Sequence, residues 1–348
     1  MSTTSHQVLY TAAQDMSAIQ DKTVDLVVTS PPYPMIEMWD EIMMKQNSGI
    51  LRAFEDKDFQ QGYELMHVEL DKVWAECYRV MKEGGIACIN IGDATRTLDK
   101  NFVLYPNHAR IIQAFIKLGF QNLPNIIWRK QTNAPNKFMG SGMYPPGAYV
   151  TLEHEYILVF RKGRKREFKK EEQKVERRRS SYFWEERNNW FSDVWDIKGT
   201  KQKMIDKAAR ERSAAYPFDI PYRLINMFSV QGDTVLDPFL GTGTTTLAAM
   251  ASMRHSIGIE IDSQLSESIT TSILDKEEVL NQVIAARLDA HRRFVEERLK
   301  LKGPDAFKHK SSHYGFPVIT KQEALLQFSL LKDVIKVEGG FEASYSDG

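Results

Sequence analysis

Short apolar runs alternate with longer amphipathic stretches along most of this 348-residue chain. Runs rich in β-branched and other apolar residues predict strands at residues 24–29, 86–91, 125–128, 156–160, 234–236 and 256–261. Apolar residues at helical spacing predict helices at residues 64–81, 108–118, 221–228, 244–253 and 276–301. This alternation is typical of an α/β fold in which helices flank a mostly parallel sheet.

Two of the predicted helices carry a clear apolar face. In the first, Val68 and Cys77 lie on one side, and the glycine pair at Gly84 is expected to end the helix. The last, residues 276–301, repeats apolar residues at helical spacing over its whole length. It leads into a C-terminal extension, residues 276–348, which we expect to be largely helical and to pack against the main domain.

Charge is unevenly distributed along the chain. The formal net charge is zero, yet residues 161–212 carry 18 Lys and Arg against 10 Asp and Glu, and the remaining residues carry 28 against 36. A basic segment therefore interrupts an acidic body. Residues 161–179 are suited to neutralising phosphates, although the interleaved glutamates are equally typical of a solvated charged helix or loop.

Cysteine content and hydropathy argue against several classes of protein. The two cysteines, Cys77 and Cys88, form no metal-binding pattern, which favours a reduced protein without a structural zinc or other metal. Residues 1–15 contain no basic region followed by an apolar stretch, and no apolar run approaches about 18 residues. We therefore expect a cytoplasmic protein that is neither secreted nor inserted in a membrane.

The first predicted strand ends in a stiff turn. Ser30 is followed by Pro31, Pro32 and Tyr33, and the two prolines forbid both continued strand pairing and an immediate helix. They either form an ordinary rigid turn or hold Ser30 and Tyr33 in a fixed geometry for chemistry. The turn taken alone does not decide between these interpretations.

A second motif, TVLDPFLGTGTTTLAAM at residues 234–250, predicts a strand, a glycine turn and a helix. Glycines let a ligand approach the backbone closely, and the helix start offers free amides, so the segment predicts a nucleotide-like cofactor site. Gly243 is followed by threonines, which excludes a phosphate-binding loop, and the third glycine of a dinucleotide fingerprint is missing. Glu260 ends the next strand 23 residues after Asp237, about where a carboxylate meets ribose hydroxyls. An ordinary strand-turn-helix with a capping threonine is the alternative.

Together, the two motifs resemble those of the amino-methylating DNA methyltransferases. Asp237-Pro-Phe-Leu-Gly-Thr-Gly-Thr with the later Glu260 is similar to their cofactor motif, and Thr29-Ser-Pro-Pro-Tyr is similar to their catalytic motif. The catalytic motif comes first by more than 200 residues, with the basic segment between, as in the permuted β class. The resemblance implies a Rossmann-like methyltransferase fold with circularly permuted motif order, with S-adenosyl-L-methionine as cofactor and double-stranded DNA as substrate.

A third segment, residues 211–225, is similar to the family segment that wraps the methionine end of the cofactor. Two positions depart from the family pattern: Arg212-Ser213 stands in place of the usual His-Pro, and Thr11-Ala12 in place of a frequent Gly-Asp, for which Asp15 is a candidate substitute. The resemblance implies a cofactor site made of Asp237, Pro238, Phe239, Gly241, Thr242, Gly243, Thr244, Glu260, Ala214, Tyr216 and Pro217.

The resemblance also divides the chain into regions. Residues 1–160 are expected to form the catalytic half of the methyltransferase domain, 161–212 a small target recognition region, and 213–275 the cofactor-binding half, followed by the extension 276–348. DNA contacts are expected from Arg164, Lys165, Arg166, Arg177, Arg178 and Arg179. The aromatic and amide residues of 181–195 are suited to base edges or to a small core. Residues 138–150, rich in glycine and proline, predict a loop that closes over DNA or the cofactor, or an ordinary surface loop.

In the family, the turn after the first strand is the catalytic centre, so the resemblance assigns Ser30, Pro31, Pro32 and Tyr33 to catalysis. The Ser30 hydroxyl and the Pro31 carbonyl, which Pro32 holds extended, would accept the two hydrogens of an exocyclic amine. Tyr33 would stack on a base turned out of the duplex. Serine at the first position resembles cytosine-N4 enzymes, with adenine-N6 as the alternative.

Two other functional classes are less favoured by the motif order. They are a methyltransferase acting on RNA or protein, and a silent DNA-binding module that keeps the fold. A cognate restriction endonuclease is a candidate partner, although a solitary methylase is also consistent with the sequence. The sequence does not distinguish a monomer from a homodimer.

Overall fold

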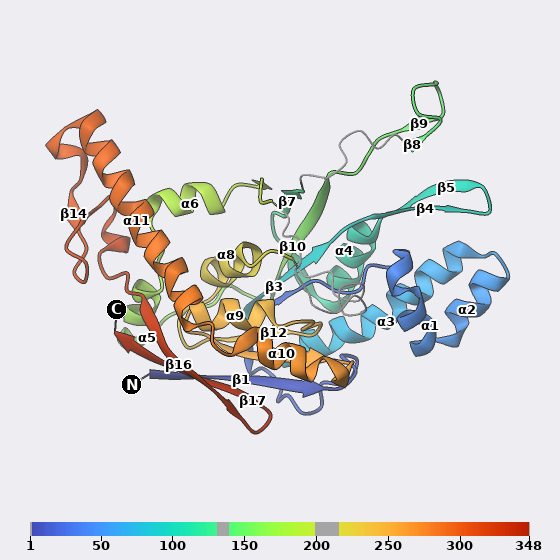
Figure 1. The fold of residues 1–348 in the computed structure, drawn as a ribbon, viewed down its shortest axis with the longest axis horizontal. Helices are drawn as coiled ribbons and strands as arrows, with labels where there is room; N and C mark the ends of the chain where they lie inside the picture. The colour runs from blue at the N-terminus through green and yellow to red at the C-terminus, as the bar shows by residue number, and fades with distance from the viewer. Residues whose placement is uncertain (1, 131–138, 199–215, 348) are drawn as a thin grey trace.

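An eleven-stranded mixed sheet runs through the residues that the computed structural model describes, 2–130, 139–198 and 216–347 (Figure 1). Its strands follow the order β11-β7-β10-β3-β2-β12-β13-β1-β17-β16, and β6 pairs with β10. The five central strands are parallel: β3 (Met81–Ile91), β2 (Val24–Thr29), β12 (Thr234–Asp237), β13 (His255–Glu260) and β1 (Ser2–Tyr10). The predicted α/β class is confirmed, with parallel pairing at the centre of the sheet.

Both ends of the sheet are built mainly from antiparallel strands, and only the short terminal strand β11 pairs parallel, with β7, among the described strands of these two ends. Beyond β3 lie β10 (His154–Lys162), β6 (Phe120–Asn122), β7 (Ile126–Arg129) and the short β11 (Val194–Trp195). Beyond β1 lies a hairpin of β17 (Gly340–Asp347) and β16 (Ser329–Val337). The expectation of a largely helical extension is therefore wrong for this last part, because β17 instead covers the edge of β1, which would otherwise expose unpaired backbone groups.

Smaller hairpins and helices surround this sheet. The hairpins are β4 (Ala94–Leu98) with β5 (Asn101–Tyr105), β8 (Met139–Gly140) with β9 (Ala148–Tyr149), and β14 (His309–Lys310) with β15 (Pro317–Val318). The α-helices are α1 (Asp40–Gln46), α2 (Ser48–Glu55), α3 (Phe59–Val80), α4 (Asn107–Leu118), α5 (Glu171–Arg179), α6 (Trp184–Trp190), α8 (Asp219–Phe228), α9 (Thr244–Ala251), α10 (Ser266–Ile273) and α11 (Glu277–Lys302). Over the described ranges, none of these helices has the length and apolar content needed to span a bilayer.

Helices cover both faces of the sheet, as Figure 1 shows. All six residues of β2 are buried, which is the pattern of a strand covered on both sides. Leu26 and Val28 pack into a core with α8, α9 and the start of α11. Val24 and Val27 pack into a second core with α3 and α4 on the other face. The two cores hold the carboxyl ends of the parallel strands in a fixed arrangement.

Helix α3 differs from its prediction both in where it begins and ends and in which of its residues are buried. Asp58 caps its start by accepting a hydrogen bond from the Gln61 amide. The helix ends at Val80 and β3 begins at once, so Gly84 lies in the strand and does not terminate the helix. Cys77 is buried as predicted, whereas Val68 is 40% exposed because the buried stripe is displaced around the helix.

Helix α11 packs against the main domain, as expected for this segment. Leu280 and Ile284 are buried in the packing against the sheet and its neighbours. Further along, the buried Arg287 guanidinium donates to the Glu186 carboxylate of α6 at 2.6 and 2.7 Å. This ion pair joins the C-terminal helix to the region that the sequence analysis set apart as 161–212.

Candidate active site

A cavity opens at the carboxyl edge of the parallel sheet, where β2, β12 and β13 end. Its empty volume is about 1040 Å³, part of which is open to solvent. The two motifs separated by more than 200 residues both line it. The predicted site residues in its wall are Ser30, Pro31, Pro32, Tyr216, Asp237, Pro238, Phe239, Gly241, Thr242, Thr244 and Glu260.

The remaining predicted residues lie elsewhere. Gly243 forms the N-cap of α9 with a left-handed φ of 88°, so its contribution is to the turn. Pro217 lies at the start of α8, where its carbonyl accepts a hydrogen bond from Ile220. Tyr33 lies next to Ser30 but outside the cavity wall. Ala214 falls outside the described residues.

Asp237 lies buried beneath the glycine turn and hydrogen-bonds to the residues around it. This buried carboxylate accepts hydrogen bonds from the Thr29 hydroxyl at 2.6 Å, the Thr245 hydroxyl at 2.5 Å and the Phe239 amide at 3.0 Å. Because Thr245 donates to Asp237, the Tyr216 hydroxyl donates to Thr245, at 2.6 Å. Burial raises the pKa of Asp237, and the three donors partly oppose that shift. The end of β2 and the start of α9 are thereby tied to one side chain.

Glu260 forms the acidic side of the cavity. Its carboxylate accepts from the Gly241 amide and from the Asp262 amide, each at 2.9 Å. Burial raises its pKa, and these two amides oppose the shift. Each carboxylate oxygen can accept more than one hydrogen bond, so Glu260 retains the capacity to accept from the hydroxyls of a ribose.

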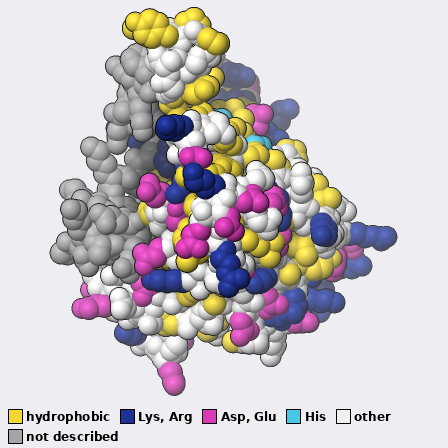
Figure 2. Space-filling view, turned by 90° about the vertical axis from the view of Figure 1, so that its right-hand side faces the viewer, with side chains coloured by type: hydrophobic (Ala, Val, Ile, Leu, Met, Phe, Trp, Pro, Cys, Tyr) yellow, Lys and Arg dark blue, Asp and Glu magenta, His cyan; other side chains and the backbone are white. Residues whose placement is uncertain are grey.

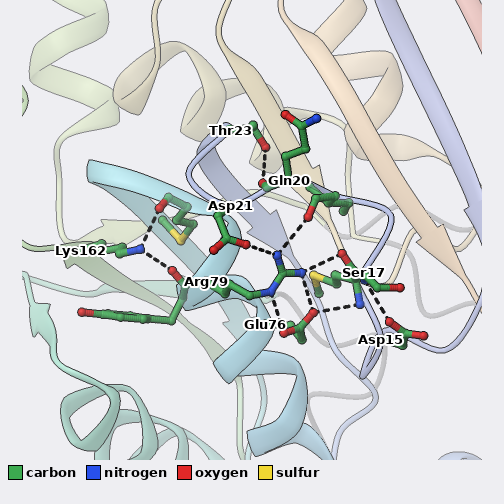
Figure 3. Close-up of polar contacts among 12 residues, drawn as sticks. Asp15, Ser17, Gln20, Asp21, Thr23, Glu76, Arg79 and Lys162 are labelled. Carbon is green, nitrogen blue, oxygen red and sulfur yellow. Dashed lines mark hydrogen bonds and ion pairs between the residues drawn. The ribbon is translucent and has the colours of Figure 1, made fainter.

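The loop between β1 and β2 supplies a further part of the wall, through Ala13 and Gln14. Figure 3 shows how Arg79, on the last turn of α3, holds this loop. Its guanidinium donates to the carbonyls of Met16 and Ile19 at 2.8 and 3.0 Å, and it also pairs with carboxylates of the loop and of α3. Asp15, the candidate substitute carboxylate, accepts from the Ser17 amide and does not line the cavity.

Behind Ser30 lies a hydrogen-bonded group that the sequence analysis missed. The Tyr33 hydroxyl donates to Glu155 Oε2 at 2.8 Å and accepts from Asn90 Nδ2 at 2.7 Å. Asn90 Nδ2 also lies 2.8 Å from Glu155 Oε2, and Lys130 Nζ donates to Glu155 Oε1 at 2.6 Å. Burial, followed by the Glu155 charge, raises the pKa of Tyr33 well above its usual value, so Tyr33 is a neutral phenol.

The direction of these bonds determines what Ser30 can do. Tyr33 has one hydroxyl proton, which it gives to Glu155, so in the 3.1 Å contact between Ser30 Oγ and Tyr33 Oη the serine is the donor. Ser30 Oγ also accepts a long hydrogen bond of 3.5 Å from Asn90 Nδ2, and its second lone pair is available as an acceptor. The only sequence signals for this group were a polar residue, Asn90, within an apolar strand and a Glu at the start of β10.

The cavity wall is chemically selective. Among the described residues that line it there is no Lys or Arg, whereas Asp237, Glu260 and Asp262 contribute carboxyl groups. Trp39 and Ile261 contribute apolar surface. Among these described lining residues a phosphate group has no cationic partner, whereas a cationic nucleoside has carboxylates and apolar walls. These residues fit S-adenosylmethionine, which carries a sulfonium charge and an adenosine.

The predicted DNA-binding residues are not brought to this cavity. Arg166 pairs with Asp233 at 2.6 Å and with Asp25 at 3.4 Å, at the amino ends of β12 and β2. The chain reaches that edge because β10 runs antiparallel to β3 and ends there. Arg164, Lys165, Arg177, Arg178 and Arg179 belong to the same loop and to α5, at the opposite edge of the sheet from Ser30.

Three of the six aromatic residues of 181–195 are buried, whereas Trp184 and Phe191 are exposed. Phe183, Trp190 and Trp195 are at most 6% exposed. Trp195 Nε1 donates to the Trp190 carbonyl at 3.0 Å, and Phe183 packs in a small core with Ile284. These three residues are therefore buried, Phe183 in the small core and Trp195 in the main core of the sheet.

A Rossmann-like sheet with this cavity at its carboxyl edge defines an S-adenosylmethionine-dependent methyltransferase. Comparison with known proteins agrees: residues 24–271 match the N6_N4_Mtase model, described as DNA methylase. The chain belongs to this N4-cytosine/N6-adenine DNA methyltransferase family.

Two relatives and one solved structure illustrate the similarity. The Type II methyltransferase M.MthZI of Methanothermobacter thermautotrophicus is 48% identical over 99% of this chain and 96% of its own length. M.MjaI of Methanocaldococcus jannaschii, also named a Type II methyltransferase, is 51% identical over 78% of this chain and 92% of its own. The S-adenosylmethionine complex of TTHA0409, a putative DNA modification methylase from Thermus thermophilus, has a TM-score of 0.59 and 32% identity, over 77% and 94% of the two chains.

Proposed function

We propose that this enzyme methylates the exocyclic N4 amine of cytosine in double-stranded DNA, with Ser30 at the catalytic centre. The observation that carries the proposal is the lining of one cavity by Ser30-Pro31-Pro32 and by the glycine turn after Asp237. Serine at the first motif position favours cytosine N4 as the acceptor. The motif order supports assignment to the permuted β class, with Thr29-Ser-Pro-Pro-Tyr as the catalytic motif.

Catalysis on this site depends mainly on orientation of the amine. The lone pair of an exocyclic amine is delocalised into the base. The site must therefore localise that lone pair on the nitrogen before the nitrogen can attack the methyl carbon. The Ser30 hydroxyl oxygen and the Pro31 carbonyl accept the two amine hydrogens and achieve this bias. S-adenosylmethionine, when bound, supplies the electrophilic methyl group.

The hydrogen bonds among Ser30, Tyr33 and Glu155 make Ser30 an acceptor toward the base and connect it to a carboxylate. Because Ser30 donates its own proton to Tyr33, its oxygen faces the base as an acceptor only. After transfer the amine nitrogen is acidic, and its proton can pass to Ser30 as Ser30 gives its own to Tyr33 and Tyr33 its own to Glu155. Lys130 stabilises the negative charge that Glu155 carries before this step. Glu155 is then the proton acceptor of the site.

DNA is expected to approach the carboxyl edge, from which two hairpins project. Phe102 of β5 and Tyr149 of β9 stack with centroids 4.5 Å apart, which links the hairpins. Met143 and Tyr144 at the tip of the β8–β9 hairpin are 81% and 79% exposed, and Figure 2 shows hydrophobic side chains gathered on that tip. We propose that they contact the duplex or fill the place of a flipped base.

The biological setting follows from the relatives named Type II methyltransferases. We propose that the enzyme protects DNA against a restriction endonuclease with the same recognition sequence.

We also propose that the chain divides into a catalytic half, residues 1–160, and a cofactor-binding half, residues 213–275. Modification-sensitive sequencing of DNA from cells that express the chain is the test, since it reports the recognition sequence and the methylated atom. N6-methyladenine in place of N4-methylcytosine would contradict the proposal.

A further inference from the structure

A broad groove lies at the amino edge of the sheet, away from the cofactor cavity. It is enclosed by the loop after β10, by α5, by the start of α6, by the end of α8 and by residues 320–325. Its empty volume, open solvent included, is about 3150 Å³, against about 1040 Å³ for the cofactor cavity. The groove is thus larger than the cofactor cavity and has room for an extended ligand such as a polymer.

The groove is strongly basic, although the chain as a whole is neutral. Eight Lys and Arg residues line it, and Glu323 is the one Asp or Glu among its described lining residues. That carboxylate is already used: it accepts from the Trp184 amide at 2.9 Å and from the Thr320 amide at 2.7 Å. Carboxylates outside the lining pair with Arg166, Lys174 and Arg178, and the remaining lining cations leave the groove with an excess of positive charge.

Several of these cations have no carboxylate partner among the described residues. Lys165, Arg177, Arg187 and Lys321 are exposed and make no ion pair there, in contrast to Arg166. They come from three separate parts of the chain: the loop after β10, the consecutive helices α5 and α6, and the turn near residue 320. Helix α5 neutralises part of its own charge through Glu171 and Glu176, but the four cations without a carboxylate partner in the described part of the chain converge on the groove from separate segments.

The groove is held at a fixed distance from the catalytic centre. Arg166 is anchored to Asp25, whereas Ser30 lies at the other end of the same strand, and five residues of strand span roughly 17 Å. Gly84, with a φ of 81°, lets the basic loop approach β3, since a Cβ there would lie 2.6 Å from the Arg166 backbone nitrogen. The basic loop is thus part of the rigid sheet edge.

We propose that this groove binds the phosphate backbone of a second duplex DNA segment while the catalytic edge holds the first. Unpaired, exposed Lys and Arg side chains bind phosphodiesters by releasing counterions, independently of sequence. A straight duplex lying on the carboxyl edge does not reach the amino edge, because DNA is stiff over about 150 base pairs. The occupant is therefore a distant part of the same molecule or a separate duplex. The inference rests on DNA methyltransferase activity and not on the role of Ser30.

The direct test is capture of a second duplex. Protein is saturated with an immobilised duplex of about 20 base pairs that contains the recognition sequence, and a labelled duplex without that sequence is added at low salt. Wild-type protein should retain the labelled duplex, whereas Lys165→Gln/Arg177→Gln/Lys321→Gln should weaken its binding about 100-fold and lower the salt slope by about 2.7. The control Lys117→Gln/Arg293→Gln/Lys308→Gln removes the same charge from exposed residues outside the groove and should behave as wild type.

Methylation assays separate this site from the catalytic one. The groove variant should methylate the short duplex at the wild-type rate and show a raised KM on plasmid DNA. Failure of wild type to capture a second duplex, or equal capture by the groove variant, would overturn the proposal. Preference for RNA over duplex DNA would overturn it as well, and loss of short-duplex methylation would place these cations with the catalytic edge. Absence of methylation by wild type itself would count against the proposed function instead.

Discussion

Replacing Tyr33 by Phe tests the proposed orientation of the Ser30 hydroxyl at the proposed catalytic centre. The substitution keeps the aromatic ring but removes the hydroxyl that accepts the Ser30 proton and donates to Glu155. Ser30 is then free to turn its proton toward the target amine, which opposes acceptance of the amine hydrogens. Loss of one orienting hydrogen bond of about 1.4–2.8 kcal/mol in the transition state corresponds to a roughly 10- to 100-fold lower kcat.

The stability effect can be worked out from the same contacts. Glu155 loses one of its donors but keeps Asn90 and Lys130, so the free energy of unfolding should fall by only about 1.5–3 kcal/mol, the value of one charged hydrogen bond. Steady-state kinetics with S-adenosylmethionine binding measured in parallel provide the assay. Affinity for the cofactor should be nearly unchanged, because Tyr33 does not line the cavity.

Tyr63→Phe is the matched control. The Tyr63 hydroxyl is buried without a hydrogen-bond partner among the described residues, so its removal should leave kcat unchanged. Equal kcat in Tyr33→Phe and wild type would refute the assignment of the serine proton. A similar loss in both variants would show that the effect is not specific to Ser30.

Three further predictions concern the scaffold. Asp237→Ala leaves two threonine hydroxyls and an amide without their acceptor, so it should cost about 3–5 kcal/mol of unfolding free energy and abolish cofactor binding by calorimetry, whereas Asp237→Asn should retain most of the stability. Arg287→Ala leaves the largely covered Glu186 carboxylate without its partner and should cost about 3 kcal/mol in urea unfolding; a loss below 1 kcal/mol would contradict a structural role for this pair. Burial lowers the pKa of His67 to about 3 in the folded protein, against about 6.5 in the unfolded chain. The neutral His67 therefore contributes its full stability only above about pH 6.5. The free energy of unfolding should fall by about 2 kcal/mol between pH 7 and 5, because the unfolded chain takes up a proton there and the folded protein does not. His67→Gln should remove that part of the pH dependence, and the exposed His313→Gln should not.

The residues that line the cavity were predictable because each motif is contiguous in sequence. Ser30 and Asp237 follow directly after apolar runs, and the carboxyl ends of parallel strands meet at one edge of a sheet. Their proximity therefore required only that both strands be parallel. Gly243 and Pro217 were predicted with the same motifs, and in the structure they shape the turn and the start of α8 without lining the cavity.

Residues that depend on strand order and register could not be predicted. Glu155 reaches Tyr33 because β10 is antiparallel to β3 and aligns Tyr156 with Ile91, a register that neither strand specifies alone. The same antiparallel pairing carries the basic segment to the amino edge, away from Ser30. Strand β1 was missed because its alternating polar and apolar residues have few large side chains, and it became recognisable only through its neighbours β13 and β17.

Nucleoside analysis of methylated DNA tests the central claim most directly. Duplex DNA is incubated with labelled S-adenosylmethionine and either wild type or Ser30→Ala, digested, and analysed by mass spectrometry. We predict N4-methylcytosine from wild type and at least a roughly 100-fold lower yield from Ser30→Ala, with cofactor affinity preserved. Labelled N6-methyladenine would contradict the target base, and a near-normal yield from Ser30→Ala would contradict the assignment of this turn as the catalytic centre.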